Sequence, residues 1–228
     1  MGARDFAQKA SAFCGHPAVA MSANESPNGQ YADAMKLANA TAALPPEATP
    51  SLQLGYSLVR NIRAWEVRTG EDVRALLELD RQLGVALRTG PPPAPLNAAL
   101  DDTLALLRGD AEHLLSLAKR LGVTIGVIVS KAPEAIALQD FWSRKQRWFT
   151  LPNNLRNDVE HGPDFRRSST ATIVRLGYGV GWVRYATSGP GNPGREIDLV
   201  PGMVTELLGI WDEFLAISAG LRPGRRTV

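Results

Sequence analysis

The chain has 228 residues, of which 44% are hydrophobic and 21% charged, and this fits one large soluble domain or one domain with an appendage. A formal net charge of +2 is too small to indicate nucleic-acid binding by itself, so any such argument must come from local patches. The single cysteine, Cys14, excludes an intrachain disulfide, and no apolar run approaches the roughly 18 residues of a membrane span. We therefore expect a cytoplasmic protein without a membrane partner.

Residues 1–50 are rich in Ala, Ser, Asn and Pro and poor in large apolar side chains. They predict a partly helical N-terminal arm, with helices around Arg4–Phe13 and Gly29–Ala43. Cys14 and His16 resemble half of a metal site, but no second pair of ligands follows at finger-like spacing. We interpret this segment as a loop with an incidental thiol, and we expect no metal and no cofactor.

Helical periodicity becomes clear after residue 50. An apolar stripe at spacings of three and four predicts a helix that ends near Gly70. The stripe consists of Leu54, Leu58, Ile62 and Trp65. Thr69 followed by Asp72 resembles a capping start, which predicts a second helix over about Glu71–Arg88. Its inward positions include Val73, Leu76, Leu77 and Leu83.

The proline-rich segment Gly90–Pro95 predicts a stiff connection that is not helical inside. After it, apolar residues follow a heptad pattern for three repeats. They are Leu100, Leu104, Leu107, Ala111, Leu114, Ala118 and Leu121. We interpret them as one central bundle helix that ends at Gly122, with an intermolecular coiled coil as the alternative. The β-branched run Val123–Val129 fits either a buried extended connector or the start of the next helix.

A further helix is predicted from Pro133 to about Phe149. In its second half, FWSRKQRWF, the basic residues Arg144, Lys145 and Arg147 alternate with aromatic residues. Aromatic rings that stack on bases, beside cations that hold phosphates, form an RNA-binding surface. The same spacing also fits buried aromatics with a solvated basic face.

The segment Leu151–Gly162, LPNNLRNDVEHG, predicts a short helix with defined ends. Pro152 suits the first turn, and Thr150 or Asn153 is a candidate cap. Gly162 stops the helix because glycine tolerates the left-handed conformation of a C-terminal cap.

The pattern then changes to period two. The runs TATIVRL and VGWVRYA flank Gly177–Gly179 and predict a β-hairpin. A turn over Gly189–Gly194 leads to a possible third strand, REIDLV, and a last helix begins at Pro201. The inward residues of this helix are expected to be Val204, Leu207, Leu208, Trp211, Phe214 and Leu215.

The fold class that follows is mainly α. We predict a helical bundle of about five to six helices with a small β-hairpin or meander inserted before the C-terminal helix. The arm covers residues 1–50, the helical domain 51–220 with the meander at 170–200, and a flexible tail 221–228.

The chemistry available in this sequence is limited. HExxH and paired CxxC motifs do not occur, and nothing resembles a nucleophile elbow. Arg156 and His161 on one short helix suit a phosphodiester, because imidazole exchanges protons near neutral pH and a guanidinium binds phosphate oxygens.

The string LRNDVEHG, on a helix late in a helical bundle, resembles the signature of the HEPN superfamily. That signature is an arginine, four to six residues and a histidine, with a polar residue directly after the arginine. Arg156, Asn157 and His161 match these three positions. The resemblance implies a compact helical bundle and a metal-independent RNase of toxin, antiphage or RNA-processing type. It also implies a homodimer whose two motifs meet at one cleft, with RNA as substrate and an antitoxin as a possible partner.

Other interpretations stay open at the sequence level. A second copy of the spacing, Arg108 and His113, lies within the heptad helix and has Gly109 where the family prefers a polar residue. Arg156 and Glu160 are four apart and also suit a surface ion pair. The rival hypothesis is a non-catalytic helical binding or regulatory module.

Overall fold

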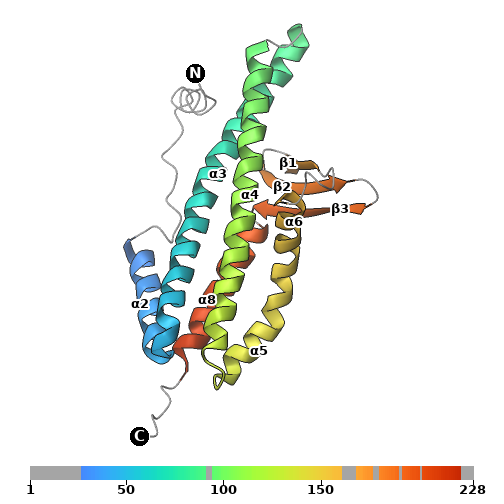
Figure 1. Ribbon diagram of the computed structural model, residues 1–228. Coiled ribbons are helices and arrows are strands. Elements are labelled where there is room, and N and C mark those ends of the chain that lie inside the picture. The colour runs from blue at the N-terminus through green and yellow to red at the C-terminus, as the bar shows by residue number, and fades with distance from the viewer. Residues whose placement is uncertain are drawn as a thin grey trace, which may run out of the picture. The chain divides into compact units, whose positions relative to one another are not determined.

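The computed structural model describes residues 27–90, 94–160, 168–176, 180–189, 192–200 and 202–221 (Figure 1). Six α-helices lie within these residues: α2 (Pro27–Ala43), α3 (Thr49–Thr89), α4 (Ala94–Ser130), α5 (Ile136–Lys145), α6 (Thr150–Glu160) and α8 (Gly202–Ala219). Two short 3₁₀ helices, η1 (Pro46–Ala48) and η2 (Gln146–Phe149), and three strands complete the elements. The mainly helical fold with a small sheet before the last helix is confirmed. The helix predicted at Arg4–Phe13 and the pair Cys14 and His16 lie outside the described residues.

The described residues form two compact units. The sheet unit takes segments 63–115 and 154–204, and the aromatic unit takes the described residues of segments 18–62, 116–153 and 205–228. Helices α3 and α4 contribute to both units, because each is continuous across a segment boundary.

Helix α3 is one helix of 41 residues, so the predicted break near Gly70 is wrong. The buried positions Trp65, Thr69 and Leu76 keep helical spacing straight through Gly70. A continuous inward face therefore outweighs the local cost of one glycine, about 1 kcal/mol. Leu54 is 44% exposed and does not face inward as predicted, because the buried face at this end of α3 is centred on Leu52 and Gly55 instead.

Helix α4 also continues past its predicted end. It runs through Gly122 to Ser130, so the run Val123–Val129 is neither an extended connector nor a new helix. The heptad residues from Leu107 to Leu121 are buried within the chain. This favours the central bundle helix over an intermolecular coiled coil at that seam. Ala94 and Pro95 already belong to the first turn of α4, where a missing N–H costs nothing.

By length and composition, α4 is also apolar enough to cross a membrane, with 56% of its most apolar window buried inside the protein. A core helix passes the same test, so this property assigns no location.

The sheet is antiparallel, in the order β1 (Ser168–Leu176), β2 (Val180–Gly189) and β3 (Asn192–Val200). The register of the predicted hairpin runs from Ser168 opposite Ser188 to Leu176 opposite Val180. Val183, Tyr185 and Thr187 alternate along β2 and are buried, which gives the sheet one covered face. The hairpin and the third strand are thus confirmed, while the Gly177–Gly179 turn lies outside the described residues.

The aromatic unit is built around α8. Trp211 and Phe214 are buried with ring centroids 5.3 Å apart, and Phe141 of α5 lies 6.0 Å from Phe214. Of the six residues predicted to face inward on α8, all are fully buried except Leu208, which is half-buried. Helix α2, which falls within the predicted arm, buries Ala40 in this unit, and Leu44 just after it is buried too.

Candidate functional site

Helix α6 carries two of the three residues of the predicted site. Arg156 and Asn157 follow Leu155, which is fully buried and fixes the rotation of the helix, and both are half-buried. Pro152 lies in the first turn, as predicted. His161 lies outside the described residues, so the described geometry of the site consists of Arg156 and Asn157.

The start of α6 differs from the prediction. Thr150 has helical dihedrals, φ −64° and ψ −43°, because η2 runs directly into α6. An N-cap residue has non-helical dihedrals, so Thr150 does not cap the helix. The described part of α6 ends at Glu160, and the predicted stop at Gly162 lies outside the described residues. The N-terminus of the helix is a continuation of η2 and not a separate start.

A group of polar side chains between α3 and α4, which we call the polar layer, lies in the same sheet unit as Arg156. The indole Nε1 of Trp65 donates to the carbonyl oxygen of Asp110 at 2.5 Å, and Arg68 Nη2 donates to Asp110 Oδ1 at 2.6 Å. Thr69 is fully buried one turn after Trp65, and Asp72 follows at the next inward position. Sequence reasoning missed this layer, because Thr69 and Asp72 resemble a helix cap. The signal that indicates the layer is that Thr69 and Asp72 continue, at helical spacing, the inward series that contains Trp65.

The hydroxyl of Thr69 gives a first stability prediction. Its Oγ1 is buried without a hydrogen-bond partner among the described residues. Burying such a hydroxyl costs about 1–3 kcal/mol, so we expect Thr69→Val, which has the same shape, to stabilise the protein by about 1 kcal/mol. Urea unfolding measures this change. A lower midpoint for the valine variant would mean that the hydroxyl has a stabilising partner.

Glu66, in the same stretch of α3, predicts a pH dependence. Burial raises the pKa of the Glu66 carboxyl, and the positive charge of Arg63 partly opposes that shift. Because the folded pKa lies above the unfolded one, the stability that Glu66 contributes is present at acidic pH and is lost as the pH rises through the folded pKa. We therefore expect Glu66→Gln to unfold at a higher urea concentration than wild type at pH 7. Near pH 4 this advantage should shrink or reverse, and an equal advantage at both values would contradict the burial effect.

The second copy of the motif spacing is on the surface of α4. Arg108 and His113 are both exposed. Five residues place them about 140° apart around the helix. Leu107 and Leu114, next to them, are buried core positions, so core packing orients this helix and leaves Arg108 and His113 on its exposed side.

The basic and aromatic segment is packed mostly within the aromatic unit. Phe149 lies 5.9 Å from Trp142 and 5.1 Å from Trp148, measured between ring centroids. The predicted RNA-binding residues Arg144 and Lys145 approach Glu213 at 3.7 and 2.9 Å, and Arg147 is exposed. The contacts fit buried aromatics with a solvated basic face.

Two glycines of α4 make room for these rings. A Cβ at Gly122 would lie 2.7 Å from Phe149, and one at Gly126 would lie 3.1 Å from Trp142. Gly122 is therefore explained by packing against an aromatic ring and not by the end of a helix.

Within the described part of the chain, no group of three or more His, Cys, Asp or Glu side chains is placed to hold a metal ion. No protein-family model, no curated protein and no solved structure matches the chain.

Proposed function

We propose that this protein is a metal-independent endoribonuclease of HEPN type, in which Arg156, Asn157 and His161 form the site. The proposal rests on the sequence match of these residues and on one structural observation. Arg156 and Asn157 are adjacent and half-buried near the end of a short helix, anchored by the buried Leu155, in a mainly helical protein. Partial burial limits the positions of a side chain while leaving it accessible to a substrate.

The proposed reaction is cleavage by the ribose 2′-hydroxyl. The 2′-oxygen attacks the neighbouring phosphorus as its proton passes to a neutral imidazole, and the bond from phosphorus to the 5′-oxygen breaks. The leaving 5′-oxygen takes a proton from an imidazolium. Arg156 neutralises the charge that builds on the phosphate oxygens, and Asn157 orients the phosphate or the imidazole.

This reaction favours a homodimer. A base and an acid are needed together, and a single His161 cannot be neutral and protonated at once. Two protomers related by a two-fold axis supply two imidazoles. The motif would then act as a composite site, with RNA as substrate and an antitoxin protein as a possible regulator.

A non-catalytic helical module is the second candidate, and one observation favours it. Arg156 already takes part in an interaction within the chain. If the guanidinium of Arg156 stabilises the fold, its presence is explained without a catalytic role. The protein would then bind a partner without cleaving RNA.

The test is incubation of the purified protein with a mixed-sequence RNA in EDTA, followed by analysis of the new ends. The proposal predicts 2′,3′-cyclic phosphate and 5′-hydroxyl ends. Cleavage that stops in EDTA would overturn the metal-independent mechanism, and absence of cleavage at all protein concentrations would favour the binding module.

A further inference from the structure

Segment 116–153 of the aromatic unit combines exposed apolar side chains with an excess of positive charge. Within the described part of the chain, eight large hydrophobic side chains are exposed, and four of them belong to this segment. They are Val123, Val127, Ile136 and Leu151. The segment has six basic and two acidic residues, a formal charge of +4 compared with +2 for the whole chain, so the other residues together carry −2. Apolar and electrostatic interactions are therefore both available over one short stretch of chain.

Two valines and a tryptophan adjoin on the outer side of α4. Val123 and Val127 are four residues apart, so they lie on the same side of the helix. Trp142 packs against Gly126, since a Cβ at that glycine would lie 3.1 Å from the Trp142 ring. Gly126 directly precedes Val127, so the indole lies next to the valine pair. The ring is half-buried and therefore partly accessible.

A second tryptophan extends this surface along η2. Phe149 lies over Gly122, where a Cβ would come within 2.7 Å of its ring, and the ring centroids of Trp148 and Phe149 are 5.1 Å apart. Trp148 is also half-buried. We call the four side chains the valine–tryptophan face, and they are Val123, Val127, Trp142 and Trp148. Tryptophan is typical of the boundary between an apolar and an aqueous phase, because its ring is apolar and its N–H is polar.

Basic residues border the valine–tryptophan face. Arg120 precedes Val123 by about one helical turn, and Arg147 directly precedes Trp148. Both arginines are exposed, and Lys119 beside Arg120 is half-buried. None of these three cations forms an ion pair with another described residue. Their charges are therefore available to an external anion.

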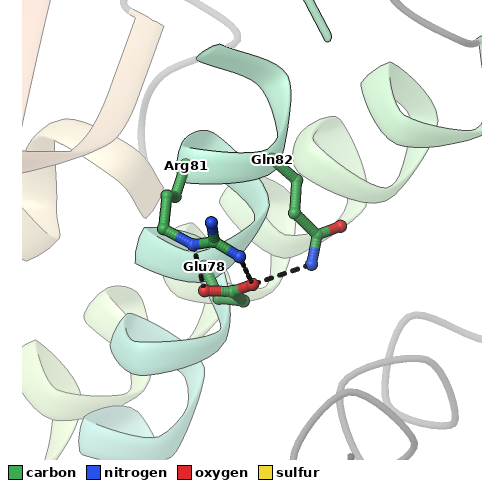
Figure 2. Close-up of polar contacts among 3 residues, drawn as sticks. All are labelled: Glu78, Arg81 and Gln82. Carbon is green, nitrogen blue, oxygen red and sulfur yellow. Dashed lines mark hydrogen bonds and ion pairs between the residues drawn. The ribbon is translucent and has the colours of Figure 1, made fainter. Parts of the chain in front are cut away.

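An ion pair within the chain makes a cation less available to an anionic surface, and several basic residues are paired in this way. On α3, Arg81 donates to both carboxylate oxygens of Glu78, from Nε at 2.9 Å and from Nη2 at 2.6 Å (Figure 2). In the aromatic unit, Glu213 lies 3.7 Å from Arg144 and 2.9 Å from Lys145. The cations that border the valine–tryptophan face have no such competitor among the described residues.

We propose that the valine–tryptophan face binds the surface of an anionic lipid bilayer. The valines and the indole rings insert at the boundary between headgroups and acyl chains, and the bordering cations contact lipid phosphates. This proposal departs from the sequence-based expectation of no membrane partner, which rested on the absence of a spanning segment. None of the residues involved belongs to the motif on α6, so the inference goes beyond the proposed function.

The shape and chemistry of the face favour a lipid surface over a folded partner or RNA. Val123 is 61% exposed, so it projects from a convex helix and does not line a groove that a partner helix could fill. RNA bases stack on aromatic rings, but the valines offer them neither a stacking surface nor a hydrogen bond. A bilayer surface accepts aliphatic and aromatic groups together, and its anionic headgroups match the charge of +4 on this segment.

The test is co-sedimentation of the purified chain with sucrose-loaded vesicles, in the absence of RNA. Vesicles of phosphatidylglycerol and phosphatidylcholine in equal parts provide an anionic surface, and vesicles of phosphatidylcholine alone provide a neutral one. We expect binding to the anionic vesicles that weakens at high salt, and binding to the neutral vesicles that is weaker by about tenfold or more. A chain that does not bind the anionic vesicles would overturn the proposal, and RNA binding that depends on Arg120 and Arg147 would then identify RNA as the occupant.

Charge reversals locate the electrostatic part of the contact. Arg120→Glu/Arg147→Glu should weaken binding to the anionic vesicles about tenfold or more. Arg74→Glu/Arg108→Glu is the matched control, because it changes the net charge equally at exposed positions outside the segment. In about 0.1 M salt, charges more than about 10 Å from the lipid are screened, so this control should bind nearly as wild type does. Equal weakening by both double variants would mean a general attraction of charge and would overturn the proposal.

Serine replacements test whether the valines insert. Val123→Ser/Val127→Ser keeps every charge and should still weaken binding about tenfold, because less apolar surface leaves water. Val85→Ser, at an exposed valine of α3, is the control and should bind like wild type. Circular dichroism of each variant checks that the helices remain folded. Wild-type binding by Val123→Ser/Val127→Ser would exclude the valines from the contact and overturn the proposal.

Discussion

His161→Ala should reduce RNA cleavage by about a hundred- to ten-thousand-fold, which is the range that a positioned acid or base contributes. Arg156→Ala should cause a loss of similar size, because charge on the phosphate oxygens would no longer be neutralised. Initial rates on a defined RNA in EDTA measure both effects. His113→Ala is the matched control, since it removes an exposed histidine at the same motif spacing. Unchanged cleavage by His161→Ala would exclude this histidine from the reaction.

Mixing protomers tests whether one site needs two histidines. Wild type combined with a stoichiometric amount of His161→Ala, after subunit exchange, leaves about a quarter of the dimers with two wild-type protomers. A composite site predicts that total activity falls to about a quarter of that of the same total amount of wild type. If each protomer works alone, activity falls only to about half. Both outcomes presuppose that wild type cleaves RNA. The experiment therefore tests only whether one site needs the histidines of two protomers, and not whether the protein is a ribonuclease.

The fold followed largely from the periodicity of apolar residues. The change from helical spacing to period two located the sheet before the last helix, and buried Val183 and Tyr185 confirm the alternation. The prediction fails where a local signal conflicts with the longer pattern. Gly70 and Gly122 each predict a helix end, although inward residues continue at the same spacing past both.

The environment of the candidate site was less predictable. A motif in the sequence locates Arg156 and Asn157 on one helix, but it does not show what surrounds them. The polar layer depends on the packing of α3 against α4, which brings Asp110 to Trp65 and Arg68 from more than 40 positions away in sequence. The composition of FWSRKQRWF likewise did not decide between base stacking and core packing, because both uses require the same residue types.

Replacing either of two glycines of α3 with alanine should change the stability of the protein, in opposite directions. Gly55→Ala is expected to destabilise the protein. The new Cβ would lie 2.5 Å from Cη2 and 2.6 Å from Cζ3 of Trp211, closer than carbon atoms can approach. Overpacking of a filled core costs about 1–3 kcal/mol, which exceeds the gain of up to about 1 kcal/mol from replacing a helical glycine. Gly70→Ala meets nothing within 4 Å and should stabilise by about 0.5–1 kcal/mol.

Urea unfolding of both variants and wild type measures the two changes in stability. Gly84→Ala is a further control, because its Cβ also meets nothing within 4 Å. Stabilisation by Gly55→Ala would mean that the core rearranges around Trp211 at little cost.

The cause of the Gly55 effect can be isolated with a second substitution. Trp211 is buried and packs against Phe214, so its ring has little room to move away from α3. Trp211→Phe removes the part of the ring that the new Cβ would meet. Gly55→Ala should therefore cost less in the Trp211→Phe protein than in wild type, with a coupling of about 1 kcal/mol or more between the two positions. If Gly55→Ala lowers the free energy of unfolding equally in the wild-type and Trp211→Phe proteins, the strain lies in the backbone of α3 and not at the indole. A backbone effect does not depend on the size of residue 211.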